Sequence, residues 1–200
     1  MVTALAQRHW GDLDNLRRVI TFLRLHRDQD GALPGRWTRS LQPMDSRGFG
    51  GFDFLFSELV LMLYAETRDD QILRANYATV RRSFDALAAA AHDNGLVPGI
   101  GMYPDLPQKM GRRETSYVAI DNAAWYALCR NMEKMARMLE DEPTARRAYA
   151  LAEKVEAHFL PMFWDEEKGF IRDSFSPAEG GRVDSYPLFS LLFLESAFGR

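Results

Sequence analysis

The chain has 200 residues, of which 46% are hydrophobic and 26% are charged, and its net charge at pH 7 is -3. This size and composition fit one globular domain, and the slightly acidic balance predicts neither a nucleic-acid partner nor an anionic membrane partner. The start of the chain lacks a signal-peptide pattern, and no apolar run reaches the roughly 18 residues of a membrane span. Because Cys129 is the single cysteine, it cannot form an internal disulfide, and we expect a protein of the reducing cytoplasm.

The first predicted helical hairpin pairs a helix over about 12–28 with one over about 52–66. The first helix carries one apolar stripe, in which Leu13, Leu16 and Ile20 recur at offsets of three and four residues. A loop rich in Gly, Pro and Ser joins the two helices. The second helix is apolar on nearly every side, so it must be buried all round.

The second predicted hairpin repeats this order. A striped helix over about 70–92 leads into a loop over 94–119, and an apolar helix follows over about 120–140. The link between the two hairpins is tight, so short links and long loops alternate along the chain. The long loops therefore emerge on one face, beside the N-termini of the apolar helices, where long loops are usually functional.

The third predicted hairpin begins with a striped helix near 144 and ends with an apolar helix over about 186–198. Between them, a glycine-centred run predicts a small β-hairpin near 163–172. The three hairpin units cover about 12–66, 70–140 and 144–198. They predict an all-α fold of outer helices wrapped around inner ones, as a single domain or a fragment of one over residues 1–200.

Three segments resemble the six-hairpin glycosidases. The loop motif from Asn94 to Pro98 and the stretch from Glu114 to Tyr126, which contains a helix start, resemble the matching region of glycogen-debranching and related α-glucosidase domains. The run over 163–170 resembles a hairpin common in that superfamily. The resemblance implies that the three hairpins form about half of an (α/α)6 toroid, and that a partner carboxylate comes from the other half.

The resemblance also implies a glycoside hydrolase that acts on an oligosaccharide or small glucoside, through an α-glucosidic bond and an inverting mechanism. In that superfamily the general acid lies where a loop meets an inner helix, and Asp121 is the matching position. A carboxyl beside Trp125 on an apolar helix suits a general acid. The alternative is that Asp121 is an N-cap or a substrate hydrogen-bonding group, because Asp53 and Asp184 occupy equivalent places.

Further candidates for sugar binding lie in or beside the long loops. Aromatic rings stack on sugar faces, and carboxylates accept hydrogen bonds from sugar hydroxyls. The candidates are Trp37, Phe52, Asp53, Tyr103, Glu114, Tyr117 and Asp184. Plain loop packing is the alternative for the aromatic residues, and an exposed loop position is the alternative for Glu114. We assign Trp125 and Trp164 to the core.

The four histidines are far apart in the sequence, so we expect surface or capping roles for them, and no metal or other cofactor. Two other enzymes on the same toroid stay open. A glycoside phosphorylase needs a basic cluster, for which Arg36, Arg39, Arg112 and Arg113 are available; a sugar epimerase needs histidines in the cleft, which their positions disfavour.

The last alternative is an inactive fragment or a carbohydrate-binding or interaction module. A half-ring leaves apolar helix flanks that need cover, and such flanks mark interfaces. We therefore expect either self-association or a missing second half, with a carbohydrate as the other partner.

Overall fold

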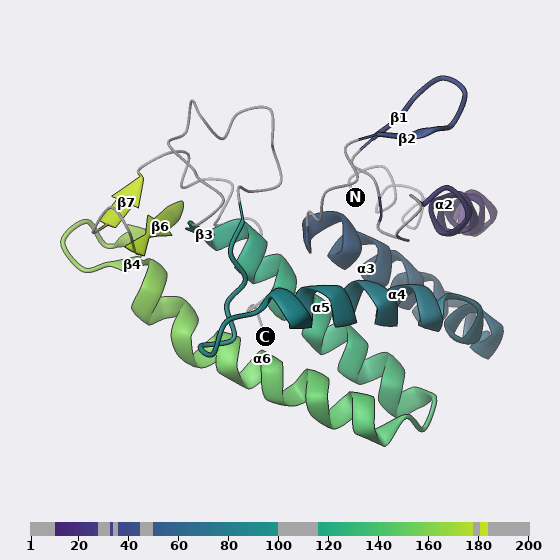
Figure 1. Cartoon of the computed structure of the whole chain (residues 1–200). Coiled ribbons are helices and arrows are strands. Elements are labelled where there is room, and N and C mark those ends of the chain that lie inside the picture. Colours follow the sequence, from purple (N-terminus) through teal and green to yellow (C-terminus); the bar gives the residue numbers. More distant parts are fainter. Residues whose placement is uncertain are drawn as a thin grey trace.

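The computed structural model describes residues 11–27, 33, 36–44, 50–99, 116–177 and 181–183. Helices dominate this part of the chain (Figure 1). They are α2 (Leu13–Leu25), α3 (Gly50–Thr67), α4 (Asp70–Ala90), α5 (Ala119–Met138) and α6 (Glu142–Phe163). These helices confirm the predicted ones to within a few residues at their ends, whereas the predicted helix over 186–198 lies outside the described residues. The fold is all-α and is part of an α/α toroid.

Short antiparallel strands decorate the helices. They are β1 (Arg36–Trp37) with β2 (Pro43–Met44), β3 (Tyr117–Val118) with β6 (Ser174–Ser176), β6 with β7 (Gly181–Val183), and β4 (Trp164–Asp165) with β5 (Phe170–Ile171). The pair β4–β5 is the predicted hairpin. Its turn is closed by Asp165, whose Oδ1 accepts the N–H groups of Glu167 at 3.1 Å and Lys168 at 3.0 Å.

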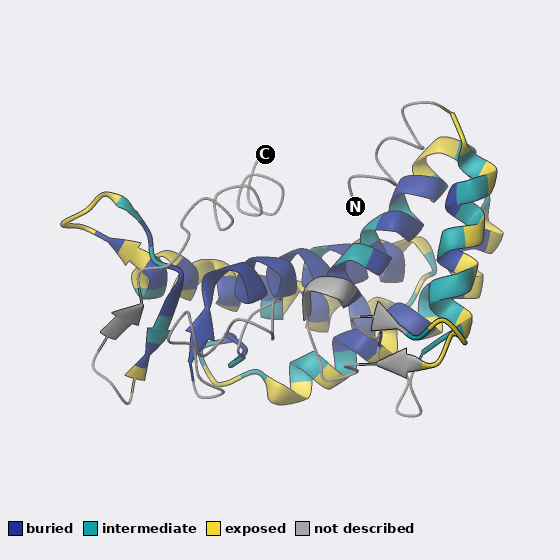
Figure 2. Cartoon of the chain, turned by 90° about the horizontal axis from the view of Figure 1, so that it is seen from above, coloured by how far each residue is buried: buried dark blue, intermediate teal, exposed yellow. Residues whose placement is uncertain are grey.

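Helix α5 is the centre of the core. It packs against α3 on one side and α6 on the other, and Figure 2 shows the central helix as buried over most of its length. Trp125, Leu128 and Met132 on α5 have no exposed surface. Burial also raises the pKa of the Cys129 thiol, so this thiol is kept protonated and unreactive.

Helix α3 is the second inner helix. From Asp53 to Leu63, its side chains are all buried or half-buried, as its apolar pattern predicts. Polar groups tie it to α5, because Nδ2 of Asn131 donates to Oγ of Ser57 and to Oε2 of Glu58, both at 3.0 Å. The two inner helices are therefore joined by a buried polar contact within an apolar interface.

The two tight links lie at the opposite end of the helices from β3. An aspartate caps the helix after each link: Asp69 accepts the N–H of Gln71 at 3.0 Å, and Asp141 accepts that of Thr144 at 3.2 Å. Figure 1 shows the starts of α3 and α5 on the side of the molecule where β3 and the β1–β2 hairpin lie. The described parts of the long connections, β1–β2 and β3, therefore lie at the N-terminal ends of the inner helices, as the alternation of links predicts.

The assignment of Trp164 to the core is wrong. Its side chain is 37% exposed, whereas the next residue, Asp165, is 2% exposed. Trp164 leaves α6 as the first residue of β4, and side chains alternate between the two faces of a strand. The carboxylate of Asp165 therefore turns inward to close the hairpin, and the indole turns outward. Within the described residues, no helix is both long and apolar enough to cross a membrane.

Candidate active site

The segment 94–99 lies as an extended strip beside β3, at the N-terminal end of α5. Pro98 forms an antiparallel bridge with Tyr117, and the N–H of Gly99 donates to the carbonyl of Ser116 at 2.9 Å. Leu96 and Val97 are buried. The loop motif is therefore an ordered part of the structure, packed against the inner helix that follows it.

Two side chains of α5 hold this strip. Oδ1 of Asn122 accepts the N–H of Val97 at 2.8 Å, and its Nδ2 donates to the carbonyl of Val97 and to that of Val118, both at 3.0 Å. One turn further along, Nε1 of Trp125 donates to the carbonyl of Gly95 at 3.0 Å. Asn122 and Trp125 are both fully buried, so the loop motif and the helix start form one hydrogen-bonded unit.

Asp121 is the third residue of α5, and its side chain is 7% exposed. The N-cap interpretation of this residue is wrong, because Val118 occupies the N-cap position of α5, with no side-chain cap hydrogen bond of its own. Strand β3 runs straight into α5, so a strand residue takes the cap position. The N–H of Ala119 is satisfied instead by the carbonyl of Asp173 at 2.8 Å.

Gly99 lies against the carboxyl group of Asp121. A Cβ atom added to Gly99 would stand 2.9 Å from Oδ2 of Asp121 and 3.9 Å from its Cγ. The backbone of the strip therefore forms one wall of the space that holds this carboxyl group, and the wall is close enough to leave no room for a methyl group.

A second buried carboxylate, Asp173, stands beside the same helix start. It directly precedes β6, its side chain is 3% exposed, and β6 pairs with β3 through Tyr117–Phe175 and Val118–Ser174. Asp173 is not among the residues predicted from the sequence, because its position depends on pairing between strands more than fifty residues apart. No local pattern around Asp173 signals that contact.

Two other predicted sugar-binding residues are described, and both make internal contacts. Oδ1 of Asp53 accepts the hydroxyl of Ser83 at 2.6 Å, which ties the first turn of α3 to α4. The hydroxyl of Tyr117 is hydrogen-bonded to Nδ1 of His92, and their rings pack edge to face. Asp53 is 6% exposed and Tyr117 is 7% exposed, so each shows only a small surface to a ligand.

Comparisons with known proteins identify the family. Residues 17–188 match the family described as bacterial alpha-L-rhamnosidase 6 hairpin glycosidase domain. The chain belongs to this family. It is also similar to solved structures at low sequence identity, which shows the shared fold. The resemblance to the six-hairpin glycosidase superfamily is therefore confirmed.

The similar structures are much longer than this chain. A rhamnosidase from Klebsiella oxytoca with rhamnose bound matches with a TM-score of 0.72 and 17% identity, over 95% of this chain and 35% of that one. A GH78 family rhamnosidase of Bacillus sp. GL1 matches with a TM-score of 0.65 and 17% identity, over 78% of this chain and 17% of that one. The α-L-rhamnosidase from Dictyoglumus thermophilum matches with a TM-score of 0.53 and 15% identity, over 74% of this chain and 16% of that one. The comparison with curated proteins found no match.

The remaining predicted site residues of the six-hairpin domain are not described in full. Tyr103, Glu114 and Asp184 lie outside the described residues, and for Trp37 and Phe52 only the backbone is described, in β1 and α3. Their predicted role in sugar binding stays a prediction. Among the described residues, no group of histidine, cysteine and acidic side chains is arranged to hold a metal ion.

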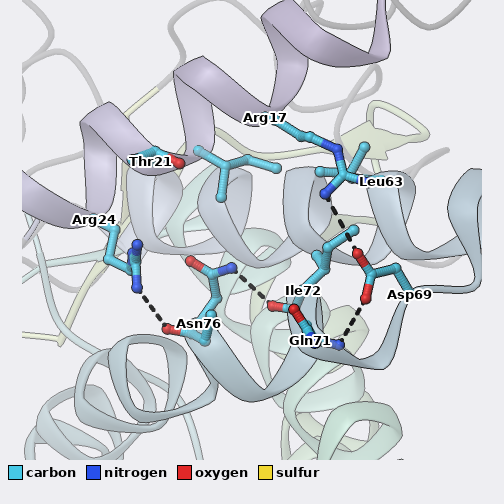
Figure 3. Close-up of a pocket in the computed structure, with 10 residues that line it drawn as sticks. Arg17, Thr21, Arg24, Leu63, Asp69, Gln71, Ile72 and Asn76 are labelled. Atoms are coloured by element: carbon cyan, nitrogen blue, oxygen red, sulfur yellow. Dashed lines mark hydrogen bonds and ion pairs between the residues drawn. The ribbon is translucent and has the colours of Figure 1, made fainter.

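The six-hairpin domain also has a surface pocket of about 230 Å³ between α2, α3 and α4. Figure 3 shows Arg17 and Arg24 of α2 facing Asp69 and Asn76 across it. Leu63, in the wall of this pocket, is ten residues along α3 from Asp53, which corresponds to about 15 Å of helix. The pocket therefore lies toward the tight links, away from the helix ends where Asp53 and Asp121 stand.

Proposed function

We propose that this domain belongs to a glycoside hydrolase that cleaves α-L-rhamnosidic bonds. The observation that carries the proposal is the match of residues 17–188 to the rhamnosidase six-hairpin family. The rhamnose-bound Klebsiella enzyme, to which the chain is similar over 95% of its own length, supports the same substrate class. The sequence resemblance had pointed to an α-glucoside, and the family match favours a rhamnoside in its place.

In the proposed mechanism, Asp121 is the general acid. An inverting glycosidase needs one carboxylic acid to protonate the leaving oxygen and a second carboxylate to activate water on the other face of the sugar. Asp121 supports the first role in three ways: it is not the N-cap residue of its helix, it stands in the first turn of an inner helix directly after β3, and it is 7% exposed. The base is assigned to the other half of the ring, as the sequence resemblance implies.

The test is hydrolysis of alkyl α-L-rhamnosides and alkyl α-D-glucosides, whose leaving oxygen needs protonation, by the wild-type chain and by the longest protein that contains it. We expect the rhamnoside to be the better substrate, and Asp121→Asn to lower its kcat by about 10²-fold to 10⁴-fold, the usual contribution of a general acid. Asp93→Asn is the matched control, because Asp93 is an exposed carboxylate close to the same strip. Circular dichroism checks that both variants fold.

Three outcomes would contradict parts of the proposal. Faster turnover of the glucoside would refute the substrate class. Wild-type rates in Asp121→Asn would remove this residue from the mechanism. Activity that requires inorganic phosphate would replace hydrolysis by phosphorolysis.

Self-association is the second part of the proposal, because the chain spans only 35% of the Klebsiella enzyme and half a ring needs a partner surface. Light scattering during the assay tests it, and the proposal requires the active species to be a dimer or a longer chain. A monomer of this chain with full activity would contradict it. The expected cytoplasmic location stays a prediction, which fractionation of the source cells tests.

A further inference from the structure

Gly99 and Asp121 lie on two different segments of the chain, and they are in contact with each other. Asp121 is fixed on the first turn of α5, and Gly99 ends the strip 94–99. The position of a Cβ atom on Gly99 is 2.9 Å from Oδ2 of Asp121, which is closer than such atoms approach without movement. The bare Cα of Gly99 is therefore what allows the carboxyl group to lie where it does.

The strip is anchored on both sides, so it is a firm wall. Asn122 bonds both backbone groups of Val97, two residues before Gly99, and the N–H of Gly99 itself donates to Ser116. At the other end of the strip, Gly95 has φ +82° and its Cα faces α6, where an added Cβ would be 2.6 Å from Cβ of Lys154. These hydrogen bonds hold the backbone of the strip, and the carboxyl group of Asp121 takes part in none of them.

From this arrangement we propose that Gly99 is a positioning residue, which sets the orientation of the Asp121 carboxyl group by steric contact. The inference rests on the proposed role of Asp121 as general acid. A general acid must direct its proton at the leaving oxygen, and displacement of a reacting group by about 1 Å can lower the rate by about 10²-fold. Space at Gly99 therefore matters for catalysis and not for folding.

Substitution of Gly99 by alanine separates these two roles. Among the described residues, the added methyl group meets the end of a short side chain, Oδ2 and Cγ of Asp121, and no backbone atom within 4 Å. The carboxyl group is thus the part that has to move, while the strip stays bonded to Asn122. We expect Gly99→Ala to fold with a stability within about 1 kcal/mol of the wild type, because the end of one side chain gives way and the described backbone stays in place.

The readout is the dependence of the rate on the leaving group. An alkyl α-L-rhamnoside needs protonation of its leaving oxygen, whereas a p-nitrophenyl α-L-rhamnoside has a leaving group that departs with little help. We expect Gly99→Ala to lower kcat about 10-fold to 100-fold on the alkyl substrate, and less than about threefold on the p-nitrophenyl substrate, with KM unchanged. A purely structural role would lower both rates by the same factor.

Two further variants serve as references for the relative loss of kcat on the two substrates. Asp121→Asn is expected to show the same selectivity for the leaving group as Gly99→Ala, to a larger extent. Gly169→Ala is the matched control, since Gly169 has φ +66° and no atom within 4 Å of an added Cβ; it strains the β4–β5 turn without touching Asp121. Gly169→Ala should therefore change kcat on the alkyl and the p-nitrophenyl substrate by the same factor.

The outcomes distinguish this inference from the proposed function. If Asp121→Asn is selective and Gly99→Ala is not, or if Gly99→Ala fails to fold, the positioning role is refuted and the general acid stands. If Asp121→Asn shows no selectivity, the general acid is refuted and the positioning role with it. Crystal structures of the wild type and Gly99→Ala test the steric step without turnover: it requires a moved carboxyl group on an unmoved strip, and an unmoved carboxyl group refutes it.

Discussion

The two ends of α5 each bring an aspartate to the start of a helix, and they use it differently. At the tight link after α5, Asp141 is the N-cap of α6. Its carboxylate accepts hydrogen bonds from the hydroxyl of Tyr77 at 2.8 Å, from Oγ1 of Thr144 at 2.8 Å and from the N–H of Thr144 at 3.2 Å. At the other end, Asp121 stands inside the first turn of α5, and Val118 occupies the N-cap position.

The difference lies in which groups form hydrogen bonds with the backbone at each helix start. At α6 the aspartate does so, and the hydrogen bonds from Tyr77 and Thr144 lower the pKa of Asp141. Burial and the bond to Asp141 raise the pKa of Tyr77, which keeps its hydroxyl a donor. At α5 the carbonyl of Asp173 accepts the N–H of Ala119, and Nδ2 of Asn122 donates to the carbonyl of Val118. The carboxylate of Asp141 therefore holds the N-cap position of its helix, whereas that of Asp121 lies inside the first turn of its helix, where other groups bond the backbone.

Substitution of Asn122 by leucine tests the loop end of this comparison, and it has the largest expected effect on stability. The change removes three buried hydrogen bonds and leaves the N–H and carbonyl of Val97 without their partner. Because each unsatisfied buried group costs about 1–3 kcal/mol, we expect a loss of about 3–5 kcal/mol in the free energy of unfolding. Urea denaturation followed by circular dichroism measures it.

Asn122→Asp is the control for this variant. It retains an acceptor for the N–H of Val97 but loses both donated bonds, and it buries a charge at a fully buried position. It should therefore be no more stable than Asn122→Leu. A loss below about 1 kcal/mol in both variants would show that packing, and not these bonds, holds the strip.

The sequence predicted most of the helices because their apolar patterns are long. The stripe of α2 and the all-round apolar character of α3 each extend over several turns, and tertiary contacts only confirm what these patterns dictate. The β4–β5 hairpin was also predictable, since Gly169 and the residues around it form a local turn signal. Local physics was sufficient for these elements.

The site was less predictable because its contacts are not local. Asp121 comes three residues after Val118, the last residue of β3, and the sequence did not reveal that Val118 would take the N-cap position of α5. Asn122 meets Val97 across 25 residues, so its role as the anchor of the strip has no signal in the helix pattern. His92 was expected at a helix end with a surface or capping role, and its bond to Tyr117 also spans 25 residues.

Substitution of Asp141 by alanine tests the tight-link end, with an intermediate expected effect. Loss of an N-cap aspartate costs about 0.5–2 kcal/mol, so the variant should lose less stability than Asn122→Leu. Its effect on catalysis should be small, because Asp141 lies at the end away from Asp121. Urea denaturation at pH 7 and the rhamnosidase assay measure the two effects, and a large loss of kcat would contradict the proposed separation of the two ends.

The same variant should show a characteristic pH dependence. The folded pKa of Asp141 is lowered, so the unfolded state binds its proton more tightly and the stabilisation is present above the unfolded pKa of about 3.9. It is lost as the pH falls through the lower, folded pKa. The gap between wild type and Asp141→Ala should therefore be constant from pH 7 to about 5 and narrow below about 4. A gap that widened in acid would reverse the assigned shift.

Substitution of Arg81 by glutamine separates charge from hydrogen bonding at the tight link, with the smallest expected effect. Arg81 pairs with Asp141 at 3.2 Å and with Asp85 at 3.7 Å, and its side chain is 50% exposed. Exposed ion pairs contribute about 0.2–1 kcal/mol and are screened by salt, so the loss should be at most about 1 kcal/mol and should disappear in about 1 M NaCl. Asp141→Ala, whose hydrogen bonds are not screened in this way, should keep most of its loss in the same salt. If both losses disappeared together, the cap at α6 would be an electrostatic contact, and the contrast between the two aspartates would rest on charge instead of hydrogen-bond geometry.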